Sequence, residues 1–328
     1  MIDEELALSE RFTCHRRSAR VRRPETVLVS PIPPTNDAGM TFHEIGGVRE
    51  IAADYDGFVL DLWGVIHDGV KPYPGVLDCL AALLADGKRV VLLSNAPRRA
   101  YDVVNRITAI GVPQGLYHGV MSSGEEAWQY LKRRDDPFYA DLGQRCLHIC
   151  SDRDLEIRVG LDLDYVERAE EAEFILNTGP AGWDDTIEDY APILAAGRER
   201  GLKMVCANPD LMVNHGAKLA LCAGALAVHY EGIGGAVRWH GKPYPSVYDS
   251  CLELLGIADQ RRILAVGDSL RTDIAGANGA GLDSLLIAGQ GIHLDEFAPS
   301  GRLDHARIAA AAATAGVRPT IVAPTFIW

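Results

Sequence analysis

Two aspartates that close short apolar runs are the residues best placed to do chemistry. Asp61 lies near the end of the run 57–62, and Asp268 ends a similar run at 262–268, with Asp273 shortly after it. A carboxylate can attack phosphorus and form an aspartyl phosphate. Carboxylate oxygens also suit Mg²⁺, which takes few protein ligands besides water and substrate oxygens. Asp61 is therefore the candidate nucleophile, and Asp268 and Asp273 are candidate Mg²⁺ ligands.

Three further polar residues could hold a phosphoryl group. Lys242 lies between a glycine and a proline, which place its ammonium in a loop. Ser94 and Asn95 end another apolar run and offer a hydroxyl and an amide as hydrogen-bond donors. Phosphoryl transfer requires a nucleophile, a cation, a positive side chain and a few donors. The chain supplies all of these residue types at the ends of apolar runs.

Buried strands that alternate with helices are expected to position these side chains. Continuous apolar runs separated by helical patterns predict an α/β fold with a doubly wound parallel sheet covered on both faces. In open sheets of this kind, ligands bind outside the carboxyl ends of the strands, where Asp61, Ser94 and Asp268 lie. The expected elements are strands at 57–62, 89–94, 262–268 and 284–288, and a helix at 76–85.

A long insertion separates the two groups of motifs. Residues 101–237 contain strand patterns of their own, at 145–150, 173–176 and 203–207 among others. We interpret this segment as an inserted α/β domain. The core would then consist of residues 43–100 and 238–328.

The first 42 residues have a different composition from the rest. An acidic start is followed by the basic cluster 15–23 and by a proline-rich stretch at 31–34. Such a segment buries little apolar surface, so residues 1–42 are predicted to form a flexible tail. Met40 stands where the globular pattern begins, and a start assigned upstream of it in error is an alternative interpretation.

Composition excludes some classes of partner. The net charge of -13 argues against a general nucleic-acid binder, which needs a basic surface. No run has the length and apolarity of a membrane span, and we expect no signal peptide. Seven cysteines without zinc-type spacing favour reduced thiols in a cytoplasmic protein.

The ordered set of motifs resembles the haloacid dehalogenase (HAD) superfamily. The position of the insertion, between the second and third motifs, is similar to that of the class IIA branch, which includes nitrophenyl-phosphatase-like and sugar-phosphate phosphatases. The resemblance spans residues 46–291. Its motifs are Asp61-Leu62-Trp63-Gly64-Val65, Leu93-Ser94-Asn95, Gly241-Lys242-Pro243 and Gly267-Asp268 with Thr272-Asp273, and the finer matches are His67-Asp68-Gly69, Ser122-Ser123-Gly124 and Asn208-Pro209-Asp210.

The resemblance implies a Rossmann-like core, an α/β cap, and Mg²⁺-dependent hydrolysis of a small phosphorylated metabolite. It implies that Asp61 is both nucleophile and metal ligand, that the Trp63 carbonyl and Asp268 bind the metal, and that Asp273 supports them. Ser94 and Lys242 would hold the phosphoryl group. Asn208 and Asp210, in the cap, would select the substrate. Caps of this branch often take part in dimer contacts, so a homodimer is one expected assembly.

Trp63 departs from the family pattern. Phosphatases of the superfamily normally carry an aspartate here, which protonates the leaving group and later activates water. An indole cannot exchange a proton near neutral pH. His67 or Asp68 would replace the missing acid, or the enzyme favours leaving groups that need no proton, or the chain binds a phosphorylated ligand without turnover. Of the two substitutes, His67 has the better reference pKa.

Three functions are compatible with such a sheet. We predict a HAD-type phosphoric monoester hydrolase first, and a phosphometabolite-binding or regulatory module second. An NAD-binding oxidoreductase is disfavoured, because no glycine fingerprint follows the first strand. The glycine-rich run 276–281 follows a helix instead of a strand, so it fails the required context.

Overall fold

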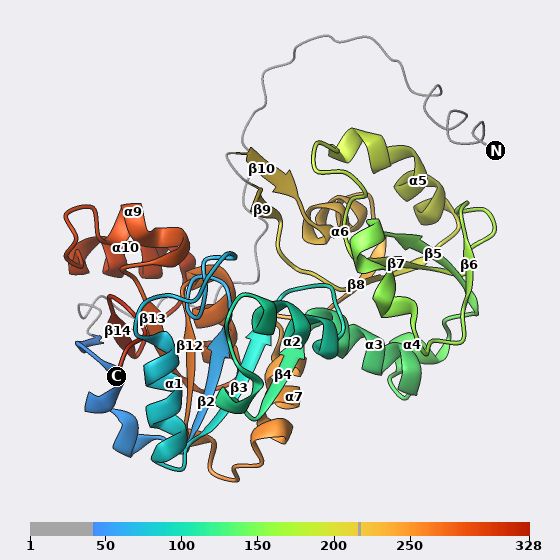
Figure 1. Ribbon diagram of the computed structural model, residues 1–328. Coiled ribbons are helices and arrows are strands. Elements are labelled where there is room, and N and C mark those ends of the chain that lie inside the picture. The colour runs from blue at the N-terminus through green and yellow to red at the C-terminus, as the bar shows by residue number, and fades with distance from the viewer. Residues whose placement is uncertain (1–41, 216–217) are drawn as a thin grey trace, which may run out of the picture. The chain divides into compact units, whose positions relative to one another are not determined.

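The computed structural model describes residues 42–215 and 218–328, whose strands form two parallel sheets and one hairpin (Figure 1). The predicted tail, 1–42, falls on residues outside this part apart from Phe42. The hairpin pairs β9 (Met212–His215) with β10 (Lys218–Leu221) in antiparallel register. The α/β fold predicted from the sequence is confirmed.

The first sheet has seven strands, and each neighbouring pair is parallel. The strands that carry the motifs, β12, β2 and β3, lie next to one another near the middle. Their carboxyl ends therefore meet at one edge of the sheet. In order across the sheet, the strands are β1 (His43–Glu44), β14 (Ile321–Ala323), β13 (Asp283–Ile287), β12 (Ile263–Gly267), β2 (Gly57–Asp61), β3 (Arg89–Ser94) and β4 (Gly119–Ser122).

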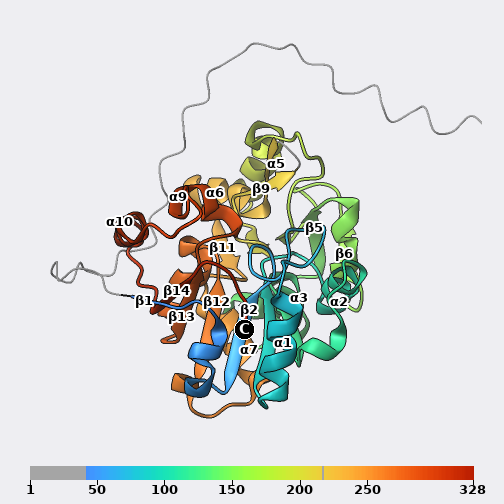
Figure 2. The ribbon, with the colours of Figure 1, turned by 60° about the vertical axis from the view of Figure 1, so that its left-hand side comes forward.

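Helices cover both faces of this sheet. Side chains of β2 alternate between the faces: Phe58 and Leu60 pack in the core with α1 (Val76–Ala85) and α2 (Ala100–Ala109), and Val59 packs in the core with α7 (Pro245–Leu255). The ribbons of these elements can be followed in Figure 2. This alternation is the period-2 pattern of a strand buried on both sides. The remaining helices near this sheet are α8 (Ala275–Gly279), α9 (Leu294–Phe297) and α10 (His305–Ala315).

The second sheet has five strands, all parallel to their neighbours. Helices α5 (Ile187–Glu199) and α6 (Ala223–Gly232) share a core with one face. Helices α3 (Ser123–Arg133) and α4 (Pro137–Ala140) share a core with the other. In order, the strands are β11 (Ala236–Trp239), β8 (Lys203–Cys206), β7 (Phe174–Asn177), β5 (Arg145–Ile149) and β6 (Asp164–Val166).

One strand lies in a different sheet from the one its sequence position suggests. β4 falls inside 101–237, the segment read as the insertion, but it pairs with β3 in the first sheet. A short apolar run has the same appearance whichever sheet it joins, because hydrophobic periodicity does not encode the pairing partner. The exact division into core and cap stays a prediction.

No helix within residues 42–215 and 218–328 combines the length and the apolarity needed to cross a bilayer.

Candidate active site

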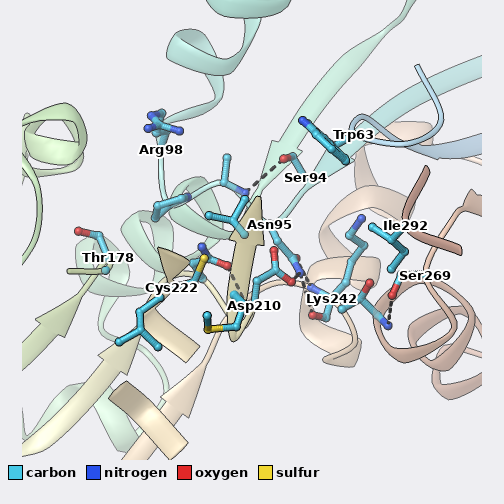
Figure 3. Close-up of a pocket in the computed structure, with 18 of the residues that line it drawn as sticks. Trp63, Ser94, Asn95, Arg98, Thr178, Asp210, Cys222, Lys242, Ser269 and Ile292 are labelled. Carbon is cyan, nitrogen blue, oxygen red and sulfur yellow. Dashed lines mark hydrogen bonds between the residues drawn. The ribbon is translucent and has the colours of Figure 1, made fainter. Parts of the chain in front are cut away.

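A cavity of about 730 Å³ lies at the carboxyl ends of the first sheet's central strands. Its lining includes Asp61 after β2, Ser94 and Asn95 after β3, and Asp268 after β12. In Figure 3, Trp63, Ser94 and Lys242 lie on one side of this space, and Thr178 and Cys222 lie on the other. The position agrees with the general location of ligand sites in open parallel sheets.

Lys242 is buried between two of the predicted carboxylates. Its Nζ lies 2.5 Å from Asp61 Oδ1 and 2.7 Å from Asp273 Oδ1. Burial alone would lower the pKa of Lys242, but the charges of Asp273 and Asp61 outweigh burial and raise it. Lys242 is therefore a permanent cation in contact with the candidate nucleophile.

Asp268 is enclosed by backbone. Its Oδ2 accepts a hydrogen bond from the backbone N–H of Ile292 at 2.7 Å. Gly64 (φ +88°) and Gly291 (φ +74°) approach so closely that a Cβ at either position would lie 2.1 or 2.0 Å from Asp268 Oδ2. Only glycine combines a positive φ with such an approach. The two loops thus fix the direction of this carboxylate.

The donor set fits a hard divalent cation. Asp61, Asp268 and Asp273 each offer an oxygen, and these oxygens lie within 4.8 Å of one another. Burial raises the pKa of Asp61 well above its usual value. Burial, and next the charge of Asp273, raises the pKa of Asp268 to about 7. Crowded, desolvated carboxylates ionise readily only when a cation compensates them, and Mg²⁺ prefers oxygen ligands of this kind.

Asn95 connects three loops. Its Oδ1 accepts the backbone N–H of Lys242 at 2.8 Å, and its Nδ2 donates to the Lys242 carbonyl at 3.2 Å and to Asp210 Oδ1 at 3.0 Å. The amide that sequence reasoning assigned to substrate thus has protein partners on both atoms. Ser94 Oγ accepts the N–H of Ala96 at 3.2 Å, which leaves the hydroxyl proton to be donated into the cavity.

Asn208 and Asp210, predicted to select substrate, both line the cavity. Asn208 Oδ1 accepts the Asp210 N–H at 2.9 Å, so Asn208 shapes the turn that carries Asp210. Desolvation raises the pKa of Asp210, and the hydrogen bond from Asn95 opposes that rise.

The two residues proposed to replace the missing acid lie in other environments. His67 is buried and is absent from the cavity lining, and its Nδ1 accepts the Gly69 N–H at 3.0 Å. Burial lowers the pKa of His67, which favours the neutral ring. Asp68 Oδ1 accepts the N–H groups of Val70 and Lys71, both at 2.9 Å, so it stabilises a turn. Trp63 itself lines the cavity with 41% of its surface exposed.

Sequence reasoning missed Gln290 and the backbone of Ile292. Gln290 Nε2 donates to the carbonyls of Gly64 at 3.0 Å and Val65 at 3.1 Å, so it holds the loop that follows the nucleophile. The sequence could have pointed to these two residues, because they follow the strand predicted at 284–288 and so lie at the sheet edge where Asp61 and Asp268 lie.

Comparisons with known proteins agree with this geometry. Models of protein families described as haloacid dehalogenase-like hydrolases match residues 58–163 and 139–281, and one described as HAD-hydrolase-like matches 239–326. A solved hydrolase of the haloacid dehalogenase-like family from Brucella suis is 33% identical, with a TM-score of 0.73, over 86% of this chain and 100% of that one.

Two curated relatives are more distant. Ribonucleotide monophosphatase NagD of Escherichia coli is 26% identical over 76% of this chain and 91% of its own length. D-glycerol 3-phosphate phosphatase of Mycobacterium tuberculosis is 28% identical over 73% of this chain and 65% of its own length. Both names describe phosphatases.

Proposed function

This chain belongs to the haloacid dehalogenase-like hydrolase family, and from that premise we propose that it hydrolyses a phosphate monoester of a small metabolite through an aspartyl phosphate. The observation that carries the proposal is the contact of Lys242 with Asp61 beside Asp268 and Asp273, at the wall of the cavity. The names of the relatives support the same class of reaction.

In this proposal each side chain of the cluster has a distinct role. Asp61 Oδ attacks phosphorus, the bond from phosphorus to the ester oxygen breaks, and the leaving oxygen takes the electron pair. Lys242 neutralises charge on the phosphoryl oxygens, and Ser94 donates a hydrogen bond to them. The leaving oxygen then takes a proton from solvent. Water attacks phosphorus, the bond from phosphorus to Asp61 Oδ breaks, Asp61 leaves as a carboxylate, and the phosphoryl group departs as inorganic phosphate while the proton of the water passes to solvent.

Asp61, Asp268 and the Trp63 carbonyl are the groups that we propose hold Mg²⁺, with Asp273 in support through Lys242. The ion would mask phosphate charge. We further propose that the second sheet and its helices form the cap, with Asn208 and Asp210 contributing to substrate selection. The six cysteines of the described residues are unpaired thiols, which favours a reducing, cytoplasmic location.

Phosphate release from sugar phosphates, nucleotides, glycerol phosphate and nitrophenyl phosphate with Mg²⁺ tests the proposal. Wild type should release phosphate from part of this panel. Asp61→Asn should lower the rate by at least about 10³-fold, because the amide is not a nucleophile. The exposed Asp249→Asn on α7 is the matched control and should retain the rate.

A second candidate is a binding module without turnover, favoured by Trp63 at the position of the acid and by the exclusion of His67 from the cavity lining. Binding of Mg²⁺ and inorganic phosphate by calorimetry, with no release from any compound, would support this module and contradict hydrolysis.

A further inference from the structure

The cavity is bounded by the carboxyl ends of strands from both sheets. Residues that follow three strands of the second sheet line it: Arg153 after β5, Thr178 after β7, and Asn208 and Asp210 after β8. Arg153 and Thr178 lie with Trp183 on the wall contributed by the second sheet. Because ligands gather at such edges, the part of the substrate that leaves with the ester oxygen is expected to contact this wall.

The positively charged side chains that line the cavity differ in whether they form ion pairs with carboxylates. Lys242 contacts Asp61 and Asp273. Arg98 has Asp154 at 3.0 Å and Asp102 at 3.5 Å.

Arg271 has one long contact to Asp210, at 3.5 Å. Among the cavity-lining cations of residues 42–215 and 218–328, Arg153 is the one without a carboxylate within ion-pair distance. In the described part of the lining, Arg153 therefore carries a positive charge that lies outside any ion pair, on the wall formed by the second sheet.

Arg153 is held in place by its neighbours. Its guanidinium lies 3.6 Å from the centroid of the Trp183 ring, and its Nε donates to Ser151 Oγ at 3.2 Å. Stacking of a planar guanidinium on an indole restricts it while its terminal N–H groups remain available. Burial lowers the pKa of Arg98, and the positive charge of Arg153 acts in the same direction.

We propose that the substrate is a phosphate monoester that carries a second anionic group, a carboxylate or a second phosphate, and that Arg153 binds this group. The proposal rests on the proposed function for the identity of the first phosphate. A guanidinium that is held in place but has no carboxylate partner matches a planar or tetrahedral oxyanion, which accepts two of its N–H groups. The opposite end of the cavity, rich in carboxylates, would take the metal and the ester phosphate.

Titration calorimetry with three non-hydrolysable phosphonates of similar length, in the presence of Mg²⁺, tests this assignment. The probes are 3-phosphonopropionate, ethylene-1,2-diphosphonate and propylphosphonate. Wild type should bind one of the two doubly anionic probes at least about tenfold more tightly than propylphosphonate, as expected for one charged hydrogen-bonded contact. The tighter of the two identifies the second group as carboxylate or phosphate.

Variants separate a direct contact from a general effect of charge. In Arg153→Gln, the dissociation constant of propylphosphonate divided by that of the tighter doubly anionic probe should fall close to 1. In Arg153→Lys, this ratio should lie between 1 and the wild-type value. Arg168→Gln is the matched control, because Arg168 is an exposed arginine that contacts Glu170 and does not line the cavity. It should retain the wild-type ratio.

A wild-type ratio near 1, or an unchanged ratio in Arg153→Gln, would overturn the assignment. Wild type could prefer a doubly anionic probe, with the preference lost in Arg153→Gln, and still release no phosphate from 2-phosphoglycolate or from the wider panel. This result would support the Arg153 site and contradict the proposed hydrolysis. The two proposals therefore fail in different measurements.

Discussion

Trp63 places an indole on the cavity wall next to the candidate nucleophile. The ring lies against Gly69, where a Cβ would be 2.9 Å from Trp63 Nε1, so the indole packs on its own loop. The substitutes considered from the sequence, His67 and Asp68, are engaged by backbone N–H groups of that same loop. Neither His67 nor Asp68 lines the cavity, and their role as the missing acid stays a prediction.

Trp63→Asp should therefore raise the hydrolysis rate in a way that depends on the leaving group. General acid catalysis contributes about 10²- to 10⁴-fold where the leaving oxygen is basic. The gain should be large for glycerol phosphate and small for nitrophenyl phosphate, whose phenolate leaves without a proton. Steady-state kcat for both compounds measures it. An equal gain on the two compounds would contradict a missing acid, and Trp63→Asn controls for the loss of the indole.

Asn95 and His67 show why individual roles were harder to predict than positions. The sequence placed Asn95 at a strand end, where it lies, but its use as a bridge to Lys242 and Asp210 depends on loops more than 100 residues away. His67 follows the nucleophile closely, yet whether its ring faces the cavity depends on the turn that its own Nδ1 stabilises. Motif spacing contains neither kind of information.

At the scale of elements, the chain passes between the two sheets twice, and a buried polar network joins the two passages. Glu126 on α3 is fully buried, and its Oε2 accepts the Gly241 N–H at 2.9 Å and lies 3.2 Å from His240 Nδ1. Tyr139 on α4 hydrogen-bonds to the other nitrogen of His240. The network therefore supports the loop that presents Lys242.

Glu126→Ala should destabilise the protein by about 3–5 kcal/mol, because it leaves buried polar partners uncompensated. Glu126→Gln, which can still accept the Gly241 N–H, should cost less. Urea unfolding followed by circular dichroism measures both, with the exposed Glu253→Ala on α7 as control. A loss below about 1 kcal/mol in Glu126→Ala would mean that the network contributes little to stability.

The elements themselves were largely predictable where a strand is buried on both faces. β2, β3 and β12 are continuous apolar runs, and the predicted bounds agree with the observed ones to about a residue. β4 was assigned to the insertion, because its four residues carry no signal for their pairing partner. The second sheet's strands were expected at 145–150, 173–176 and 203–207. Arg153, in the 3-10 helix after the first of them, did not stand out as a functional residue.

At the scale of the whole molecule, the carboxylate cluster should link stability to pH and to metal. Burial and the charge of Asp273 raise the pKa of Asp268 to about 7 in the folded chain, compared with 3.8 as the reference value. Between these values the folded state holds a proton that the unfolded state has released. Stability without metal should therefore fall as pH rises from about 4 to about 7, and the raised pKa of Asp61 acts in the same direction.

Magnesium should reverse this trend, because it binds the ionised carboxylates and competes with protons. At pH 8, Mg²⁺ at about 100 times its dissociation constant should stabilise the fold by about 2.7 kcal/mol, and at pH 5.5 by much less. Thermal unfolding in Mg²⁺ and in EDTA at both pH values measures the difference. Asp268→Asn should reduce the dependence on pH and on metal together, whereas Asp249→Asn should leave both unchanged. An equal rise in Tm with Mg²⁺ at the two pH values would contradict binding at this cluster, because its carboxylates exchange their protons for metal over this range.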